Sequence, residues 1–417
     1  MTAYAVGPQP AVKRSFGEVW VITIGHALTH WYPATFYLLL PLIGNELGLS
    51  YGQIGSILTV QAVAAAISNI PGGLLVDSVG KKSLLMALSL FWIGAPYLAM
   101  GFTDAYWIML VCSALVGIGN NLWHPTAIPL LAQRFPERRG LAVAIHGMGG
   151  NVGDAVAPLV VGAMLAAISW RSVVVMNVIP GVVMSVLILI YLGRHARQSE
   201  PMPASGGAKP EKKRVTVGDF RKLLGDKIIL LLCTGSAFRS MTQSGLLTFL
   251  PLYLAREMNY SLLWVGVWMF TLQAAGFAAA PIAGHLSDKM GRRRIIMGSM
   301  AMTALVLLLM AFSGGTSLFV LAIAFLGFFL FAIRAVMQAW ILDASPANMG
   351  GTAIGVLFGM QAVGSAIGPL VGGILADRYG LTATFYFLAA TIIIANIFIV
   401  FAPATPQHRA AVPSQII

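Results

Sequence analysis

Charged side chains are scarce in this 417-residue chain: they make up 10% of it, whereas hydrophobic residues make up 58%. A soluble globular domain uses roughly a quarter of its residues as charged groups. The composition therefore excludes an ordinary soluble domain and indicates a chain whose surface faces lipid. The two cysteines, Cys112 and Cys233, both lie in apolar stretches. They imply no disulfide framework, and we expect buried, unreactive thiols.

The chain also lacks the patterns that define several other classes of protein. Its apolar stretches are long and continuous, which excludes the alternating ten-residue strands of a membrane β-barrel. We find no phosphate-binding loop, no nucleophile paired with a base, and no cofactor loop. We therefore expect no enzyme and no cofactor, with a proton gradient as the energy source. A cleaved signal peptide is not expected either, because the apolar stretch after Lys13 and Arg14 is too long.

Acidic residues are fewer than basic ones, 14 against 26, which gives a formal net charge of +12. Twenty-one of the 26 basic residues lie in the terminal tails and in alternate loops, whereas the opposite loops hold only Arg171, Arg256 and Arg378. This distribution follows the positive-inside rule and predicts that both termini face the cytoplasm from the inner membrane. It indicates contact with anionic lipid headgroups rather than with nucleic acid. We expect a monomer.

Charged and Gly/Pro-rich turns divide the chain into twelve apolar segments, each long enough for a membrane helix of about 20 residues. We predict an all-α membrane protein of two pseudo-symmetric six-helix bundles, residues 1–193 and 226–417, joined by a cytoplasmic linker at 194–225. A short amphipathic helix is expected in that linker around Val217–Leu224. The predicted spans are 16–44, 51–76, 82–101, 105–133, 139–167, 171–193, 226–255, 262–286, 292–312, 316–343, 350–376 and 381–402.

A ten-residue signature occurs twice, 211 positions apart: Gly73-x-Leu75-x-Asp77-x-x-Gly80-Lys81-Lys82 and Gly284-x-Leu286-x-Asp288-x-x-Gly291-Arg292-Arg293. At the same offset, Gly153, Pro158 and Gly162 recur as Gly364, Pro369 and Gly373, and Gly55 recurs as Gly266. A parallel repeat in an apolar chain is typical of an alternating-access transporter with its site between the halves.

The signature resembles the hallmark loop of the major facilitator superfamily, and the resemblance covers essentially the whole chain. It implies that the two aspartates of the signature latch the cytoplasmic gate through charge contacts that break as the protein opens inward. The Gly-Pro pattern of helix five resembles one found in proton-driven exporters of this superfamily, although glycine also packs helices without any gating role. The gating candidates are Gly73, Asp77, Gly80, Lys81, Gly284, Asp288, Gly291, Arg292, Gly153, Pro158, Gly368 and Pro369.

Two further segments resemble the fosmidomycin-resistance group of exporters: Gly25-His26, and Gly117-x-Gly119-Asn120-Asn121-Leu122-Trp123-His124-Pro125. The chain departs from that group at two points. Thr126 follows the His-Pro pair where the group has an acidic residue, and helix one continues to His30 instead of carrying an Asn-Asp pair. The substrate and the proton site therefore do not transfer directly from the group.

Four of the predicted helices, the first and fourth of each half, carry polar residues at positions i and i+4, on one helix face. These helices line the cavity in the superfamily, and ionisable side chains inside a membrane indicate a functional site. Few acidic residues within the spans can neutralise Arg239 and Arg334. This favours an anionic small-molecule substrate, which a guanidinium would bind through two parallel hydrogen bonds. The substrate-binding candidates are His30, Asn120, Asn121, His124, Arg239, Gln243, Arg334 and Gln338.

Protons have four candidate carriers: His26, His30, His124 and Asp154. Imidazoles titrate near neutral pH, and a carboxyl near mid-membrane is a possible protonation switch. A purely structural role stays open for each histidine, because a buried histidine is often only a hydrogen-bonded core residue.

The same ionisable residues also allow an ion pair or a metal site. Asp154 could pair with Arg239 or Arg334 for structure alone, and we expect His146 to be structural. His26 and His30 also resemble a two-histidine metal pair. No third ligand stands at helical spacing from them, so we expect no metal site.

The favoured function is a proton-coupled secondary active transporter, an antiporter that exports a small anionic or amphiphilic compound such as a phosphonate drug or an organic acid. An organic-anion uptake symporter and a flippase for a lipid or lipid-linked anion are the competing functions. A receptor or scaffold without transport is disfavoured by two intact gate motifs.

Overall fold

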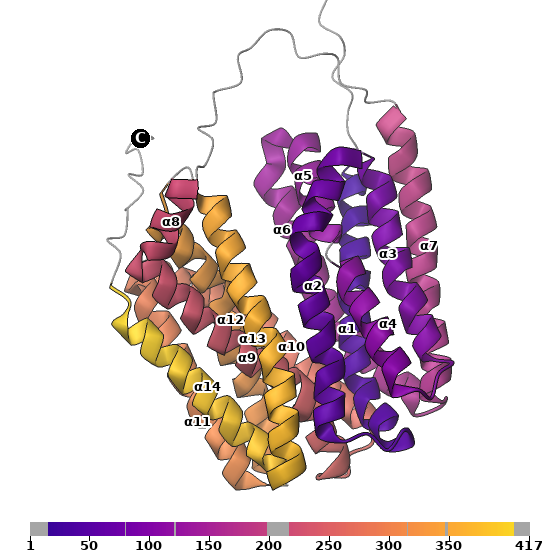
Figure 1. Cartoon of the computed structure of the whole chain (residues 1–417), viewed down its shortest axis with the longest axis vertical. Coiled ribbons are helices and arrows are strands. Elements are labelled where there is room, and N and C mark those ends of the chain that lie inside the picture. The colour runs from indigo at the N-terminus through magenta and orange to yellow at the C-terminus, as the bar shows by residue number, and fades with distance from the viewer. Residues whose placement is uncertain are drawn as a thin grey trace, which may run out of the picture.

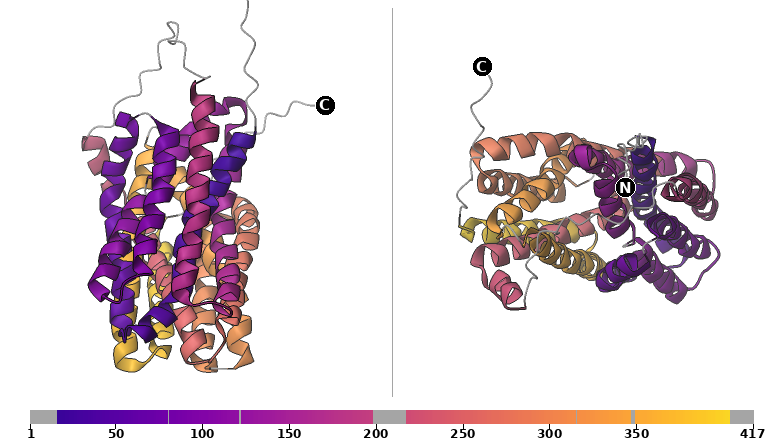
Figure 2. Two further views of the ribbon diagram at one scale, coloured as in Figure 1. Left: turned by 90° about the vertical axis from the view of Figure 1, so that its right-hand side faces the viewer. Right: turned by 90° about the horizontal axis from the view of Figure 1, so that it is seen from above.

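The computed structural model describes residues 16–79, 81–120, 122–197, 217–314, 316–346 and 349–403, and these residues form helices without any strand. The helices fall into two groups that lie side by side (Figures 1 and 2). The first group contains α1 (Gly17–Glu46), α2 (Tyr51–Val79), α3 (Lys82–Met100), α4 (Tyr106–Asn120), α5 (Trp123–Arg134), the 3-10 turn η1 (Pro136–Arg138), α6 (Arg139–Leu165) and α7 (Trp170–Arg197).

The second group repeats this order after a short extra helix, α8. Its members are α8 (Val217–Gly225), α9 (Lys227–Arg256), α10 (Leu262–Met290), α11 (Arg292–Ser313), α12 (Ser317–Ala344), α13 (Gly350–Tyr379) and α14 (Thr382–Phe401). All twelve predicted spans therefore coincide with helical stretches. The fourth is assigned as two consecutive helices, α4 and α5, on either side of residues 121–122.

Within the described residues, nine helical stretches are long and apolar enough to cross a membrane. The long helices α1, α2 and α9 are outside this set. α1 and α9 carry the polar pairs His26/His30 and Arg239/Gln243, which lower their mean hydropathy. The prediction of an all-α membrane protein is confirmed, and a count of twelve spans is consistent with the structure.

Local sequence explains where two helices of the second group begin. Asp226 caps α9, because its Oδ1 accepts hydrogen bonds from the backbone of Ile228 at 2.8 Å and of Ile229 at 3.2 Å. Gly291 of the signature separates α10 from α11 with a φ of +96°, a backbone conformation that side-chain-bearing residues rarely adopt. The signature thus supplies the tight turn that its glycine predicts.

The outer surface of both groups is apolar. Trp107 and Phe312 are 74% and 75% exposed, which would be unfavourable in water but suits contact with acyl chains. The interior packs large side chains, with Trp123, Trp340 and Phe36 all at most 1% exposed. The exposed and buried faces of these helices therefore match a bundle surrounded by lipid.

The two groups touch closely at the end that holds Glu46, which we call the Glu46 end. A Cβ on Gly55 of α2 would lie 2.1 Å from the carbonyl oxygen of Pro369 of α13, and one on Gly266 of α10 would lie 2.3 Å from that of Pro158 of α6. Because Gly55 matches Gly266 and Pro158 matches Pro369 in the repeat, these are the same contact made twice. Only glycine lets the helix backbones approach so closely.

Polar contacts strengthen the closure at this end. Asp377 near the end of α13 accepts hydrogen bonds from the first two amides of α2, at 2.7 Å from Tyr51 N and 2.8 Å from Gly52 N. A carboxylate at a helix N-terminus is favourable because it meets the unpaired amides and the positive end of the helix dipole. Thr59 also donates to the carbonyl of Ala366 at 2.6 Å.

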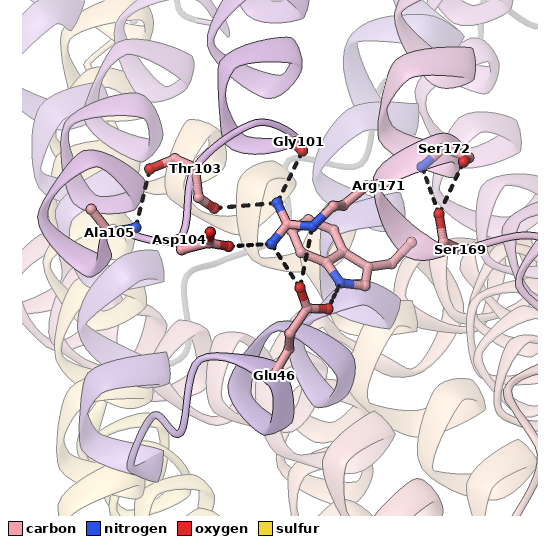
Figure 3. A network of polar contacts seen from close by, with 9 residues as sticks. Glu46, Gly101, Thr103, Asp104, Ala105, Ser169, Arg171 and Ser172 are labelled. Atoms are coloured by element: carbon pink, nitrogen blue, oxygen red, sulfur yellow. Dashed lines mark hydrogen bonds and ion pairs between the residues drawn. The ribbon is translucent and has the colours of Figure 1, made fainter.

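At the same end of the first group, Arg171 connects neighbouring segments through hydrogen bonds (Figure 3). Its guanidinium donates to Glu46 at 2.7 Å, to Asp104, and to the carbonyl of Gly101 at 3.0 Å. This basic residue therefore joins the end of α1 and the α3–α4 loop to the start of α7. Its described contacts are structural and lie within one group.

The opposite end, which holds α8, has ion pairs of a different kind. Arg134 pairs with Glu18 in the first group, while Arg292 pairs with Asp288 at 2.5 Å and Asp343 at 3.2 Å in the second. Each of these pairs joins residues of a single group. The groups also stand apart at this end in the ribbon view (Figure 1). The described contacts between the halves cited above, by contrast, all lie toward the Glu46 end.

Candidate functional site

A cavity of about 220 Å³ lies between the two groups and takes side chains from both. Six helices contribute, namely α1, α4, α6, α9, α10 and α12. The cavity is polar on part of its wall and apolar on the rest, as is usual for a small-molecule site. Its lining residues are His30, Pro33, Ala34, Tyr37, Asn120, Asp154, Pro158, Gln243, Leu247, Met269, Gln273 and Arg334.

Arg334 of α12 lines this cavity and is an exposed residue. No ion pair of Arg334 occurs in the part of the chain that the structure describes. A guanidinium without a carboxylate partner, in a cavity inside an apolar bundle, can bind an anion through up to five N–H donors. The predicted partner residue Gln338 is half-buried one turn further along α12 and is not among the lining residues.

Arg239 of α9 is not among the residues that line the cavity. It is 1% exposed, and its Nη2 donates to Gln243 Oε1 at 2.8 Å and to the carbonyl of Leu330 at 3.2 Å. These acceptors are neutral, and its Nε has no hydrogen-bond partner among the described residues. Gln243 lines the cavity. Arg239 therefore orients a lining residue and adds positive charge close to the cavity.

Histidines from three helices meet beside the cavity. His26 Nδ1 lies 2.6 Å from the backbone carbonyl oxygen of His146, and His26 Nε2 lies 3.1 Å from His124 Nε2. The ring of His146 stacks on that of His26 with 4.0 Å between ring centroids. His26 is buried, whereas His124 is exposed. The sequence placed His26 and His30 on one face of one helix, but only the fold brings His124 and His146 to them.

Asp154 of α6 binds His30 of α1. The distance from His30 Nδ1 to Asp154 Oδ2 is 3.0 Å, and the two side chains are 25% and 28% exposed. The partner of Asp154 is therefore a histidine and not Arg239 or Arg334, and its role as a protonation switch stays a prediction. Both residues line the cavity.

Asn120 is the last residue of α4, and it also lines the cavity. Its Oδ1 is buried without a hydrogen-bond partner among the described residues. Asn121 lies outside the described residues. Pro125, two residues after the start of α5, has no backbone N–H to donate.

Two polar lining residues were not predicted: Gln273 of α10 and Tyr37 of α1. The available signal for Gln273 was a lone amide within the apolar segment 262–286. No polar residue stands four positions before or after it to mark a polar helix face. The structure shows that α6 and α10 also contribute to the wall.

The predicted gating residues occupy three kinds of place. Gly153 and Gly368 pack within one group, where a Cβ would lie 2.1 Å from the carbonyl oxygen of Ala27 and 2.5 Å from that of Met241. Pro158 and Pro369 lie at the closed Glu46 end, opposite Gly266 and Gly55. The signature residues stand at the α8 end: Lys81 is exposed, a Cβ on Gly73 or Gly284 would meet nothing within 4 Å, and Asp288 pairs with Arg292. Gly80 and the side chain of Asp77 lie outside the described part.

Known proteins identify the family of this chain. The sequence model of the Major Facilitator Superfamily matches residues 20–279 and 265–415, which together span nearly the whole sequence. Among solved structures, a bacterial homologue of the human lysosomal transporter Spinster, in an inward-facing and occupied conformation, superposes with a TM-score of 0.80. That chain is 16% identical, and the match covers 95% of this chain and 97% of that one.

Two relatives are similar over more than nine-tenths of their length. The fosmidomycin resistance protein of Escherichia coli strain K12 is 25% identical over 406 residues, which are 96% of each chain. The phosphoglycerate transporter protein of Salmonella typhimurium is 24% identical over 427 residues, which are 95% of this chain and 91% of that one. The resemblance predicted from the signature and from the histidine-containing segments is confirmed. The chain belongs to the Major Facilitator Superfamily, and it is a multi-pass membrane transporter, not an enzyme.

Proposed function

We propose that this protein is a proton-coupled antiporter that exports a small anionic compound from the cytoplasm by alternating access. The observation that carries the proposal is Arg334, whose guanidinium lines the cavity between the halves with no ion-pair partner among the described residues. A ligand with a phosphonate, phosphate or carboxylate group would supply the missing anion in a bidentate contact.

The charge balance of the cavity supports an anion over a cation. Asp154 is the only carboxylate among the described lining residues, and His30 occupies one of its oxygens. Arg239 lies behind Gln243 and is hydrogen-bonded only to neutral acceptors among its described contacts. Positive charge in a low-dielectric enclosure attracts anions more strongly than the same charge does in water.

The direction of opening supports loading from the cytoplasm. The described contacts between the halves close the Glu46 end, while the α8 end holds the basic signature loops. The excess of basic residues in those loops places the α8 end in the cytoplasm by the positive-inside rule. The structure would then be the inward-facing state, with residues 1–193 and 226–417 as the two moving units and 194–225 as their linker.

The energy source follows from the ionisable groups of the wall. The Asp154–His30 pair spans α1 and α6 within the first half and faces the cavity, so protonation of Asp154 would break or weaken the contact. We place the coupled proton on the carboxyl of Asp154.

The names of the relatives agree with this class of substrate. One is named for resistance to fosmidomycin and another for transport of phosphoglycerate. Efflux and drug resistance are proposed here on that similarity together with Arg334.

Ligand binding to purified protein tests the anion site. Thermal unfolding would be measured with fosmidomycin, 3-phosphoglycerate or a simple carboxylate, because a ligand that binds only the folded state raises its stability. We expect at least one of these anions to stabilise the wild type. Arg334→Ala should weaken its binding by about tenfold to a hundredfold, the value of a lost charge-assisted hydrogen bond of about 1.5–3 kcal/mol.

Arg334→Lys is the matched control, because it keeps the charge and loses the fork, and it should bind with intermediate affinity. Equal affinity in the wild type and in Arg334→Ala would contradict the proposed site.

Flux through inverted membrane vesicles tests the direction of transport. Acidifying the lumen should drive accumulation of the bound anion if the protein is an antiporter that exports it. Accumulation driven instead by acid outside the vesicles would establish a symporter and contradict export.

A further inference from the structure

Three histidines beside the cavity bring ring nitrogens close together. His26 and His30 come from α1 and His124 comes from α5. One ring nitrogen from each can be chosen so that all three lie within 4.8 Å of one another. Residue spacing does not predict this cluster, because His124 stands 94 positions beyond His30. The third ligand that was missing at helical spacing comes from another helix.

The protonation pattern of two of these rings is set by their partners. His26 Nδ1 is 2.6 Å from the carbonyl oxygen of His146, which can only accept, so this nitrogen carries the proton. His30 Nδ1 likewise faces Asp154 at 3.0 Å. Both rings therefore keep Nε2 as the unprotonated nitrogen, and that of His26 accepts a hydrogen bond from His124 Nε2, which a bound ion would replace. Metal-binding histidines usually donate their second N–H to a carbonyl or a carboxylate in this way.

The spacing of the nitrogens suits a small ion. His26 Nε2 and His124 Nε2 are 3.1 Å apart. Two nitrogens that bind one tetrahedral zinc ion at 2.0–2.1 Å are about 3.3 Å from each other. The wider separation to His30 can close by side-chain rotation, because His30 is only half-buried and His124 is exposed.

The backbone behind the cluster leaves room for it. A Cβ on Gly150 of α6 would lie 2.9 Å from His30 Nε2 and 2.9 Å from His26 Cε1. Any larger residue there would displace the two rings. His146 contributes its carbonyl oxygen and stacks its ring on His26.

We propose that His26, His30 and His124 bind one divalent transition-metal ion, with Zn²⁺ as the best match, and leave a fourth coordination position open to the cavity. Imidazole nitrogen is a preferred ligand of zinc, nickel and copper ions, whereas magnesium and calcium require oxygen. His30 lines the cavity and His124 is exposed, so both rings are accessible to an ion. The proposal does not depend on transport, because binding alone establishes it.

Calorimetric titration of the full-length protein with zinc sulfate tests this site. The protein would carry an affinity tag without histidines. We expect one ion per chain, and we expect His30→Ala and His124→Gln each to weaken binding by more than a hundredfold. His285→Ala is the matched control, because His285 is an exposed histidine of α10 outside the cluster, and it should bind as the wild type does.

Two further measurements separate a built site from loss of fold. Asp154→Asn keeps all three ligands and removes only the support of His30, so zinc affinity should fall about tenfold to a hundredfold. Cobalt substituted for zinc should give the intense visible absorption of a four-coordinate ion. Unchanged thermal unfolding of the metal-free variants establishes that the fold is intact.

Three results would overturn the proposal. One is the absence of stoichiometric binding by the wild type. Another is unchanged affinity in a His30→Ala, His124→Gln double variant. The third is the weak spectrum of six-coordinate cobalt, which would indicate an ion held by water rather than by three imidazoles.

Discussion

At the scale of single residues, the two internal arginines have different environments although the sequence presents them alike. Both have a glutamine at i+4 and both lie within apolar helices. Arg334 is exposed in the cavity, whereas Arg239 is 1% exposed and holds Gln243. The difference follows from packing: Arg239 donates to the carbonyl of Leu330, so α12 covers it. We therefore expect the two residues to contribute to different properties.

Replacing each arginine by alanine should separate stability from binding. Arg239→Ala removes a buried donor from Gln243 and from the Leu330 carbonyl, which should lower the free energy of unfolding by about 1–3 kcal/mol. Arg334→Ala leaves no buried partner unsatisfied and should change stability little.

Thermal unfolding of the two ligand-free variants checks this prediction. Anion affinity should fall more in Arg334→Ala than in Arg239→Ala. If Arg334→Ala lowers stability more and anion affinity less than Arg239→Ala does, the placement of Arg239 behind the lining residue Gln243 is contradicted.

At the scale of helices, the repeat explains the contacts that close the Glu46 end. The sequence showed that Gly55 and Gly266, and Pro158 and Pro369, are equivalent positions. The structure places each glycine against the proline of the other half, so the closure is made by α2 with α13 and by α10 with α6. Asp377 adds a cap that the pattern did not predict, because the contact from α13 to the start of α2 spans more than 300 positions.

Asp377→Asn should weaken the closure of the Glu46 end. The amide keeps one acceptor but loses the negative charge that favours a helix N-terminus, an effect of about 0.3–1 kcal/mol at an exposed site. The population open at this end should rise about two- to fivefold.

Spin labels at Asn45 and Arg378, two exposed positions of different halves at this end, would report the change as a longer distance distribution. Asp104→Asn is the matched control, because Asp104 is also exposed at this end and binds Arg171 of its own half. An identical distribution in Asp377→Asn and the wild type would show that the cap does not hold the gate.

At the scale of the whole molecule, we interpret the structure as one state of the proposed alternating-access cycle. The halves meet at the Glu46 end, and the described ion pairs of the α8 end join residues within one half. The resemblance implied that Asp288 contacts the gate when the cytoplasmic side is closed. Its present pairing with Arg292 in its own half is compatible with the open side, and the gating role stays a prediction.

Gly55→Ala should prevent full closure of the Glu46 end. The added Cβ would lie 2.1 Å from the Pro369 carbonyl oxygen, nearer than atoms can approach, so the halves must separate there. In the proposed orientation, with the Glu46 end outside the cell, a reporter thiol introduced as Gln273→Cys in the cavity wall should then react faster with an impermeant thiol reagent added outside.

Gly298→Ala of α11 is the control for this experiment, because its Cβ would meet nothing within 4 Å. Native Cys112 and Cys233 are both buried and should contribute little reactivity. If the reporter thiol reacts equally fast in Gly55→Ala and Gly298→Ala, the glycine contact is not part of the gate.

The sequence by itself determined the class of molecule, the helical segments and the repeat. These depend on hydropathy, on charge asymmetry and on residue spacing along one chain, all of which are local or periodic properties. It also identified most of the polar residues beside the cavity, because ionisable groups are rare enough in apolar helices to be noticed singly.

Only the tertiary structure decided which of those groups meet. His124 joins His26 and His30, Asp154 binds His30 and not an arginine, and Arg239 lies behind Gln243. Each of these relations depends on how helices distant in sequence are rotated and packed against each other. Helical spacing fixes neighbours only within one helix, so the partners across helices follow from the packing of the whole bundle.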